Sequence, residues 1–400
     1  MILEIELNHS SLKKGQNVTE EDILMEISRL EREASYQSTI NKVSKVALNS
    51  IYGVLGYHSF ILYDREIARS VSEQSSHVIR YTILFFNRYF QQRFPNNKEL
   101  HEKMGITKCE PIEFNAVNYA DTDSVFIRYK DIMDKTDYKG TLEEFVFDIG
   151  SYDLNDCVKD MLEGYIRKFN GFQQKIDGQR SMKLAFEMIC HNVLWTSKKK
   201  YIKNISWEEG VYFKPLENVE VKGLDINKSS TPKFVRELLR ETVHYILQHR
   251  ELNLRDFIDH VKMQKSKFES ANVEDVAISQ RVNGYEKYVI TAKDGVFEYV
   301  KGVTIQIRAS SVYNAELAKS KYKHKYQQIR SGMKIQYYYS TDPRSDVFAF
   351  VNGDPCYEFL YPIDYSKQFE MLYLSPLNKI ITSIGVQALP VSLIAFDPLW

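Results

Sequence analysis

The stretch that most constrains the fold is Val117–Tyr129, in which apolar and aromatic residues flank a short acidic centre. This pattern predicts two β-strands joined by a tight turn that carries Asp121 and Asp123. Because residues two apart point to the same side of an extended backbone, we expect the two carboxylates to lie together. Such a pair suits a bound cation, although Asp is also common in ordinary turns.

The composition allows a folded protein of two or three domains within 400 residues. Lys plus Arg equals Asp plus Glu, so the net charge indicates neither a nucleic-acid nor a membrane partner. The four cysteines are scattered, which argues against a zinc site or a disulfide framework. No signal peptide and no membrane-spanning apolar run is apparent, so we expect a cytoplasmic protein without a membrane partner.

Two helices are expected near the amino terminus. Thr19 and Asp22 predict a capping box at the start of the first, and the second is expected over 38–52. On the second helix, Lys45, Asn49 and Tyr52 share one face and Gly53 follows. A packing face would carry Leu or Val there, so we interpret this face as one that meets a phosphate and a base pair.

Further along, apolar spacing predicts helices through 65–85, 142–172, 235–247 and 254–261. Between them, the run 183–190 is typical of a strand and holds one acid, Glu187, among apolar neighbours. A buried carboxylate needs a cation or a hydrogen-bond donor.

Two clusters of cations suit phosphate contacts. The run Lys198-Lys199-Lys200-Tyr201 follows an aromatic residue and leads into a strand-like segment, whereas a lysine run is more often a solvated patch. The loop with Lys228, Ser229 and Ser230 combines a cation with hydroxyls, although it also fits plain linker and helix-cap chemistry. Residues 301–340 hold eight cations, Arg308 among them, against one acid, with tyrosines interleaved.

Three of these motifs resemble those of family B DNA polymerases, in the family's order. Lys45-x-x-x-Asn49-Ser50-x-Tyr52-Gly53 resembles the fingers motif, and Tyr119–Ser124 resembles the palm motif with the catalytic aspartates. Ala120 stands where the family usually has Gly. The lysine run resembles the Lys-Lys-Arg-Tyr motif, with Lys200 in the arginine place, which keeps the charge and loses the bidentate fork.

The resemblance, closest to tailed-phage members, implies an α+β fold: a palm with an antiparallel β-sheet backed by helices, a helical fingers fragment and a mostly helical thumb. It implies the carboxy-terminal part of the fingers over 1–56, the palm over 57–228 and the thumb over 229–385. The end, 386–400, is expected to be packed or to bind a sliding clamp through Ser392–Trp400.

The resemblance also assigns roles to single residues. Asp121 and Asp123 are expected to be catalytic and, with Glu187, to hold two Mg²⁺ ions shared with a partner chain. Lys45, Asn49, Tyr52 and Gly53 are expected to bind the incoming dNTP. The residues expected to contact primer–template DNA are Lys198, Lys199, Lys200, Tyr201, Lys228, Ser229, Ser230 and Arg308.

We therefore expect the carboxy-terminal catalytic subunit of a split DNA-directed DNA polymerase in a phage-infected bacterium. Its partner chain would bring the first palm aspartate, the other fingers helix and the exonuclease. One alternative is a non-catalytic DNA- or clamp-binding polymerase fragment. A less favoured one is an Asp-x-Asp nucleotide-sugar transferase, which would leave the Lys45 face and the lysine run unexplained.

Overall fold

The computed structural model describes residues 19–169, 182–249, 251–291 and 297–394. The chain forms two compact units that divide between Glu187 and Met188, inside the region expected to be the palm. The domain limits themselves stay a prediction. Within the described ranges, no helix combines the length and the apolar character needed to cross a bilayer.

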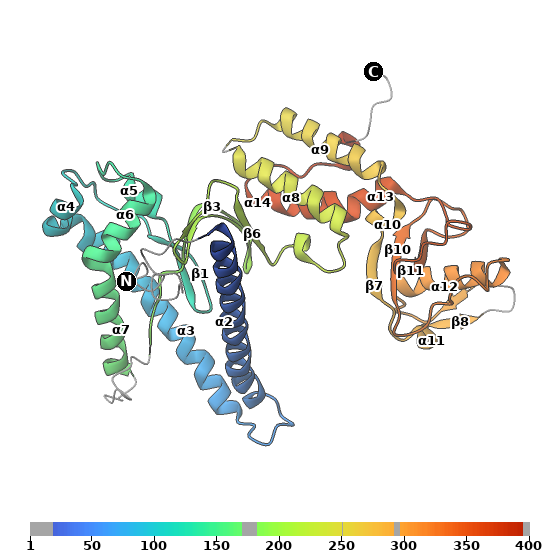
Figure 1. Ribbon diagram of the computed structural model, residues 1–400, viewed down its shortest axis with the longest axis horizontal. Helices are drawn as coiled ribbons and strands as arrows, with labels where there is room; N and C mark the ends of the chain where they lie inside the picture. Colours follow the sequence, from blue (N-terminus) through green and yellow to red (C-terminus); the bar gives the residue numbers. More distant parts are fainter. Residues whose placement is uncertain (1–18, 170–181, 250, 292–296, 395–400) are drawn as a thin grey trace. The chain divides into compact units, whose positions relative to one another are not determined.

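The first unit opens with one long helix, α2 (Glu20–Leu55), instead of the two helices expected (Figure 1). Neither Gly nor Pro occurs between residues 20 and 52, so nothing in the backbone ends the helix where the first was expected to stop. The predicted capping box is confirmed: the Thr19 side chain accepts from the Asp22 N–H, and Asp22 accepts from the Thr19 N–H. Gly53 lies inside the helix, and Gly56 is its C-cap.

The other elements of this unit enclose an aromatic core. The long helix predicted to follow Asp64 is α3 (Arg65–Arg88), and Asp64 caps it by accepting from the Glu66 N–H and the Ile67 N–H. Phe145, Met161, Leu162 and Tyr165 are buried, as their helical spacing predicted. The elements after α2 are α3 (Arg65–Arg88), η1 (Tyr89–Arg93), η2 (Phe94–Asn96), α4 (Lys98–Met104), β1 (Val117–Asp121), β2 (Ser124–Ile127), α5 (Tyr129–Met133), α6 (Leu142–Ile149), η3 (Gly150–Leu154) and α7 (Asn155–Phe169).

The second unit begins with an antiparallel sheet whose central strand is β4 (Lys200–Glu208). Its strands are β3 (Met188–Ser197), β4 (Lys200–Glu208), β5 (Val211–Tyr212) and β6 (Asn218–Lys222). Leu194, Ile202 and Val221 of this sheet share a core with helices α8 (Lys233–Gln248), α9 (Leu254–Glu269) and α14 (Ser375–Ser383). A strand over 183–190 was wrong in its first half, because β3 starts at Met188; Glu187 precedes it and is exposed.

A second sheet and core complete this unit. Strand β10 (Lys334–Tyr339) pairs with both β7 (Ile278–Arg281) and β11 (Val347–Val351), and α12 (Ile305–Lys319) packs against β11 and β10. Gln368 links the two cores by donating to Val276 O and accepting from Tyr339 N–H. The remaining elements are η5 (Asp225–Asn227), α10 (Val273–Val276), β7 (Ile278–Arg281), α11 (Tyr285–Tyr288), β8 (Val289–Thr291), β9 (Phe297–Tyr299), α12 (Ile305–Lys319), β10 (Lys334–Tyr339), β11 (Val347–Val351), α13 (Tyr365–Phe369), η6 (Glu370–Leu374) and η7 (Val391–Leu393).

The predicted α+β class, with antiparallel sheets backed by helices, is confirmed. The sheet formed by β7, β10 and β11 lies in the region that was expected to be mostly helical.

Candidate active-site and DNA-contact residues

The predicted hairpin around the two aspartates is confirmed. Strands β1 and β2 pair antiparallel, Asp121 and Ser124 are the last paired residues, and Thr122 and Asp123 form the turn. Thr122 has a φ of 51°, so the backbone between the two aspartates is not extended. The alternation argument that placed both carboxylates on one side of a strand therefore does not apply. Asp121 is half-buried and Asp123 is exposed.

Side-chain hydroxyls fasten this turn to Asp121. Thr122 Oγ1 donates to Asp121 Oδ1 at 3.0 Å, and Ser124 Oγ donates to Asp121 O at 3.2 Å. A β-branched residue rarely adopts a left-handed backbone, at a cost of roughly 1–2 kcal/mol. The acidic turn is therefore fixed by local bonds and holds a conformation that most side chains avoid.

Helix α3 supports the base of the hairpin. Asn87 Oδ1 of α3 accepts from the Val117 N–H at 3.0 Å, and Gln91 Nε2 of η1, which directly follows α3, donates to Phe114 O at 3.1 Å just before β1. The Arg128 N–H donates to Ala116 O at 2.9 Å and closes the far end of the hairpin. The aspartate turn is thus carried on a strand pair that is anchored to a long helix.

The face of α2 with Lys45, Asn49 and Tyr52 is exposed, and the Tyr52 hydroxyl is hydrogen-bonded to Ser72 near the start of α3. Gly53 has nothing within 4 Å of the position that a Cβ would take, so packing within this chain does not require glycine there. Helix α3 contacts both regions, α2 at Ser72 and the hairpin at Asn87. These two contacts are separated by about 22 Å along the axis of α3.

Among the described residues, no group of three or more His, Cys, Asp or Glu side chains is placed to hold a metal ion. Asp121 and Asp123 offer two carboxylates on one turn. Mg²⁺ is commonly bound by one or two carboxylates together with substrate phosphates, so this pair fits that ion. Glu187 is exposed just before β3, instead of buried in a strand as expected.

In the second unit, the lysine run forms the turn between β3 and β4. Ser197 pairs with Lys200, and Lys198 to Lys200 are exposed. Lys199 has a φ of 62°, and Thr196 Oγ1 donates to Lys200 O at 2.8 Å. Lys199 therefore resembles Thr122 of the first unit: in each turn, a residue other than glycine adopts the left-handed backbone conformation.

Tyr201 lies beneath this turn. The residue is 3% exposed, and its ring packs against that of Trp195 with a centroid distance of 5.2 Å. The Lys222 ammonium lies 5.7 Å from the Tyr201 ring centroid, because Tyr201 and Lys222 are paired across β4 and β6. Sequence reasoning missed Lys222; its alternation with Val219 and Val221 was the available signal for an outward cation beside the lysine run.

The loop that carries Lys228, Ser229 and Ser230 follows β6, so strand pairing brings it to the same end of the sheet as the lysine turn. Asp225 pairs with Lys228 at 2.6 Å and with Lys379 of α14 at 2.9 Å. Burial by itself would raise the pKa of Asp225, but the two ammonium groups outweigh it, and the pKa is lowered. Leu224 and Ile226 of this loop are buried in the core.

The basic stretch 301–340 is partly neutralised by acids from later in the chain. Arg308 forms an ion pair with Asp346, and Lys325 forms one with Glu358. Tyr337, Tyr338 and Tyr339 are buried in the second core and do not lie among the surface cations. The charge counted along the sequence therefore overstates the positive charge that this surface presents.

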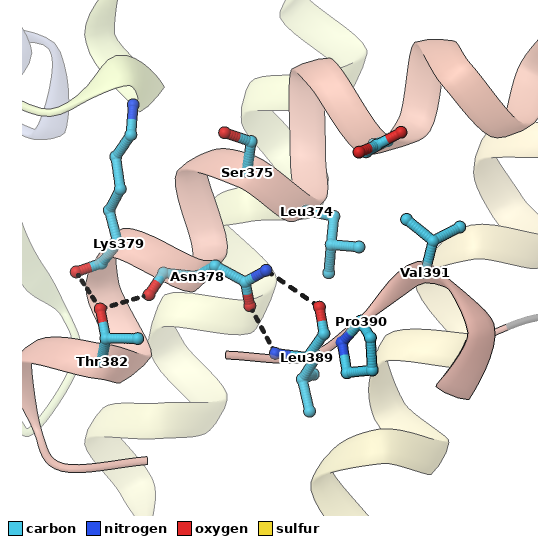
Figure 2. A pocket seen from close by; sticks show the side chains of 9 residues that line it. Leu374, Ser375, Asn378, Lys379, Thr382, Leu389, Pro390 and Val391 are labelled. Atoms are coloured by element: carbon cyan, nitrogen blue, oxygen red, sulfur yellow. Dashed lines mark hydrogen bonds between the residues drawn. The ribbon is translucent and has the colours of Figure 1, made fainter. Parts of the chain in front are cut away.

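The segment after α14 is fastened to it. Asn378 Nδ2 donates to Leu389 O at 3.0 Å, and the Leu389 N–H donates to Asn378 Oδ1 at 2.9 Å (Figure 2). These bonds border a pocket whose lining includes Ser375, Thr382, Pro390 and Val391. Leu389 and Ile394 are buried, whereas Val391, Ser392 and Leu393 between them are exposed, so the expected clamp-binding tail is only partly packed before residue 395. Its last six residues lie outside the described part.

Comparison with known proteins identifies the class. The profile of the family described as DNA polymerase family B matches residues 25–146 and 160–384. The chain therefore belongs to the family B DNA polymerases.

Two phage proteins, each named DNA-directed DNA polymerase, are similar to it. The protein of Enterobacteria phage T4 is 21% identical over 290 residues, which is 70% of this chain and 30% of the relative. That of Escherichia phage RB69 is 28% identical over 234 residues, covering 54% and 23%. This chain thus matches less than a third of the length of each relative. Family membership leaves the nucleotide-sugar transferase alternative without support.

Proposed function

We propose that this chain is the carboxy-terminal catalytic part of a DNA-directed DNA polymerase, which adds dNTPs to a primer 3′-hydroxyl as a template directs. The observation that carries the proposal is the fastened turn with Asp121 and Asp123 in a member of this family. The exposed edge with Lys198 to Lys200 and Lys222 supports it as a surface for a phosphate backbone.

In this proposal Asp121 and Asp123 hold Mg²⁺, with Glu187 as a further ligand. The ions would supply positive charge that activates the primer hydroxyl and stabilises the departing pyrophosphate. Lys45 and Asn49 bind the triphosphate, and Tyr52 lies against the new base pair in the space that Gly53 leaves open. Lys199 meets minor-groove acceptors at the primer end, which every base pair offers. The remaining cations and hydroxyls contact phosphates of the primer–template; they are Lys198, Lys200, Lys222, Lys228, Ser229, Ser230 and Arg308.

We also propose that a partner chain supplies the first palm aspartate, the exonuclease and a second fingers helix. An apolar stripe on α2 supports this partner: Tyr36, Ile40, Val43, Ala47 and Ile51 recur at helical spacing and are exposed. The stripe lies on the side of α2 away from Lys45 and Asn49, so a helix packed there would leave the nucleotide face open.

Primer extension tests the catalytic role. With the partner present, Asp123→Ala should abolish Mg²⁺-dependent extension and leave exonuclease activity largely intact. Asp134→Ala is the matched control, since Asp134 is an exposed aspartate of the same unit that pairs with Lys130. Full extension by the Asp123→Ala variant would exclude the proposed site.

A non-catalytic DNA-binding fragment is the second candidate, because the lysine edge needs no metal to bind phosphates. The two candidates differ in the outcome of the extension assay: a non-catalytic fragment would bind DNA, and replacing Asp121 or Asp123 would not change primer extension.

For a clamp we propose contact through Ser392–Trp400, where Leu393 is 44% exposed. Truncation after Ile394 should then lower processivity in the presence of the clamp and leave distributive synthesis unchanged.

A further inference from the structure

The lysine turn meets the loop after β6 at one unusually close backbone approach. Gly223 has a φ of +71°, and a Cβ on it would lie 2.2 Å from the carbonyl oxygen of Lys199. The same Cβ would lie 3.1 Å from Lys200 Cγ. Only glycine avoids both the steric overlap and the cost of the left-handed backbone.

The loop cannot withdraw to make room. Leu224 and Ile226, directly after Gly223, are buried in the core at 7% and 0% exposure. Asp225 between them is tied to Lys228 and to Lys379 of α14, and Thr231 Oγ1 donates to Asp225 O at 2.9 Å. Lys198 to Lys200, in contrast, are exposed. We therefore expect a Cβ added at Gly223 to displace the exposed lysine turn more than the anchored loop.

We propose that Gly223 is a positioning residue that sets the lysine turn against the Lys222–Ser230 segment, so that their cations form one rigid edge for the primer-strand phosphates. The identity of the ligand, primer–template DNA, rests on the proposed function. The dependence of the lysine turn on Gly223 rests on backbone geometry alone. A preorganised edge binds its ligand without the entropic cost of ordering the turn.

The first experiment compares two glycine substitutions in the full chain. Gly223→Ala should weaken binding of a primer–template duplex at least tenfold. Gly210→Ala is the matched control: Gly210 lies at the other end of β4, has a φ of +96° and has nothing within 4 Å of its Cβ position. This control bears the conformational strain without the collision and should bind DNA like the wild type. Equal DNA affinities for the two variants would overturn the proposal.

The second experiment measures the coupling without DNA. Lys199→Gly gives the carbonyl freedom to turn away, so it should recover much of the thermal stability that Gly223→Ala loses. In the Gly210→Ala background the effect of Lys199→Gly should be simply additive. A Gly223→Ala chain that does not fold should regain its fold in the double variant, and failure to do so contradicts the coupling.

The two experiments separate the inference from the proposed function. If the stability cycle is non-additive and the wild type itself does not bind the duplex, Gly223 positions the turn and the proposed DNA contact is wrong. If the wild type binds DNA and the cycle is additive, the DNA contact stands and the positioning role is wrong.

Discussion

Two strained residues occur at the two proposed sites. Thr122, Lys199, Glu209 and Leu216 are the non-glycine residues with positive φ in the part of the chain that the structure describes. Thr122 lies in the aspartate turn and Lys199 in the lysine turn. Glycine would adopt either backbone at lower free energy, and we infer for Lys199 that its ammonium contributes to DNA binding; strain alone does not decide this, because Glu209 carries it outside the proposed sites.

Lys199→Gly tests this inference. Removing the left-handed strain should raise the free energy of unfolding by up to about 1 kcal/mol, while loss of the ammonium should weaken duplex binding several-fold. Thermal unfolding and equilibrium DNA binding measure the two effects. Glu209→Gly is the control, because Glu209 is exposed with a φ of 46° in the next turn of the same sheet; it should stabilise without weakening binding. Parallel losses of stability and binding at position 199 would contradict the inference.

At the level of single elements, helices with a clear apolar stripe could be predicted from the sequence. Val235, Leu238 and Leu239 of α8 and Phe257 and Val261 of α9 are buried as their spacing indicated. Glu187 could not be placed, because an apolar run does not reveal where strand pairing starts. The basic stretch was misjudged for a similar reason: Asp346 and Glu358 reach its cations only through tertiary folding. The roles of Asp121 and Asp123 rest on motif chemistry that geometry alone does not test.

The contact between α8 and α9 makes stability depend on pH. The His260 ring stacks on Tyr245 at 4.5 Å, its Nε2 lies 3.0 Å from Thr242 Oγ1, and burial lowers its pKa below 6.5 although Glu241 opposes the shift. The unfolded chain takes up the proton more readily than the folded chain. The stabilisation that the neutral His260 ring gives the folded state is therefore complete above pH 6.5 and is lost as the pH falls below it.

Comparison of thermal unfolding at about pH 7.5 and about pH 5.5 should therefore show a smaller pH effect for His260→Asn than for the wild type. Each protein is its own control, because the quantity compared is the change in its unfolding temperature between the two pH values. An unchanged difference would show that protonation of His260 does not contribute.

The apolar stripe on α2 carries a prediction about the partner chain. Val43→Glu places a charge where a packed helix would exclude water and should greatly weaken association with the partner. Ser38→Glu adds the same charge on the opposite side of α2, where Ser38 is exposed, and should leave association intact. Co-purification of the two chains measures both. Equal association of the two variants would remove the stripe from the interface.

At the level of the whole molecule, binding and synthesis should separate. The proposed edge of the lysine turn and Lys222 lies wholly within this chain, whereas the proposed metal site takes Asp121, Asp123 and Glu187 from this chain and still needs an aspartate from the partner. The isolated chain should therefore bind primer–template DNA and not extend it, and extension should begin when the partner is added. Extension by the isolated chain would contradict the partner requirement.

Salt dependence shows how much of this binding the lysine edge carries. Each phosphate that a lysine neutralises adds about −0.9 to the slope of log K against log salt concentration on duplex DNA, so replacing Lys198, Lys199 and Lys200 together by Ala should make the slope shallower by about 2.7. Lys325→Ala is the control, because that ammonium is already paired with Glu358 and releases few counterions on binding. The change in slope for Lys325→Ala should be smaller than one third of the change for the triple variant. An equal change per lysine would show that binding depends on total positive charge and not on the edge that Gly223 positions.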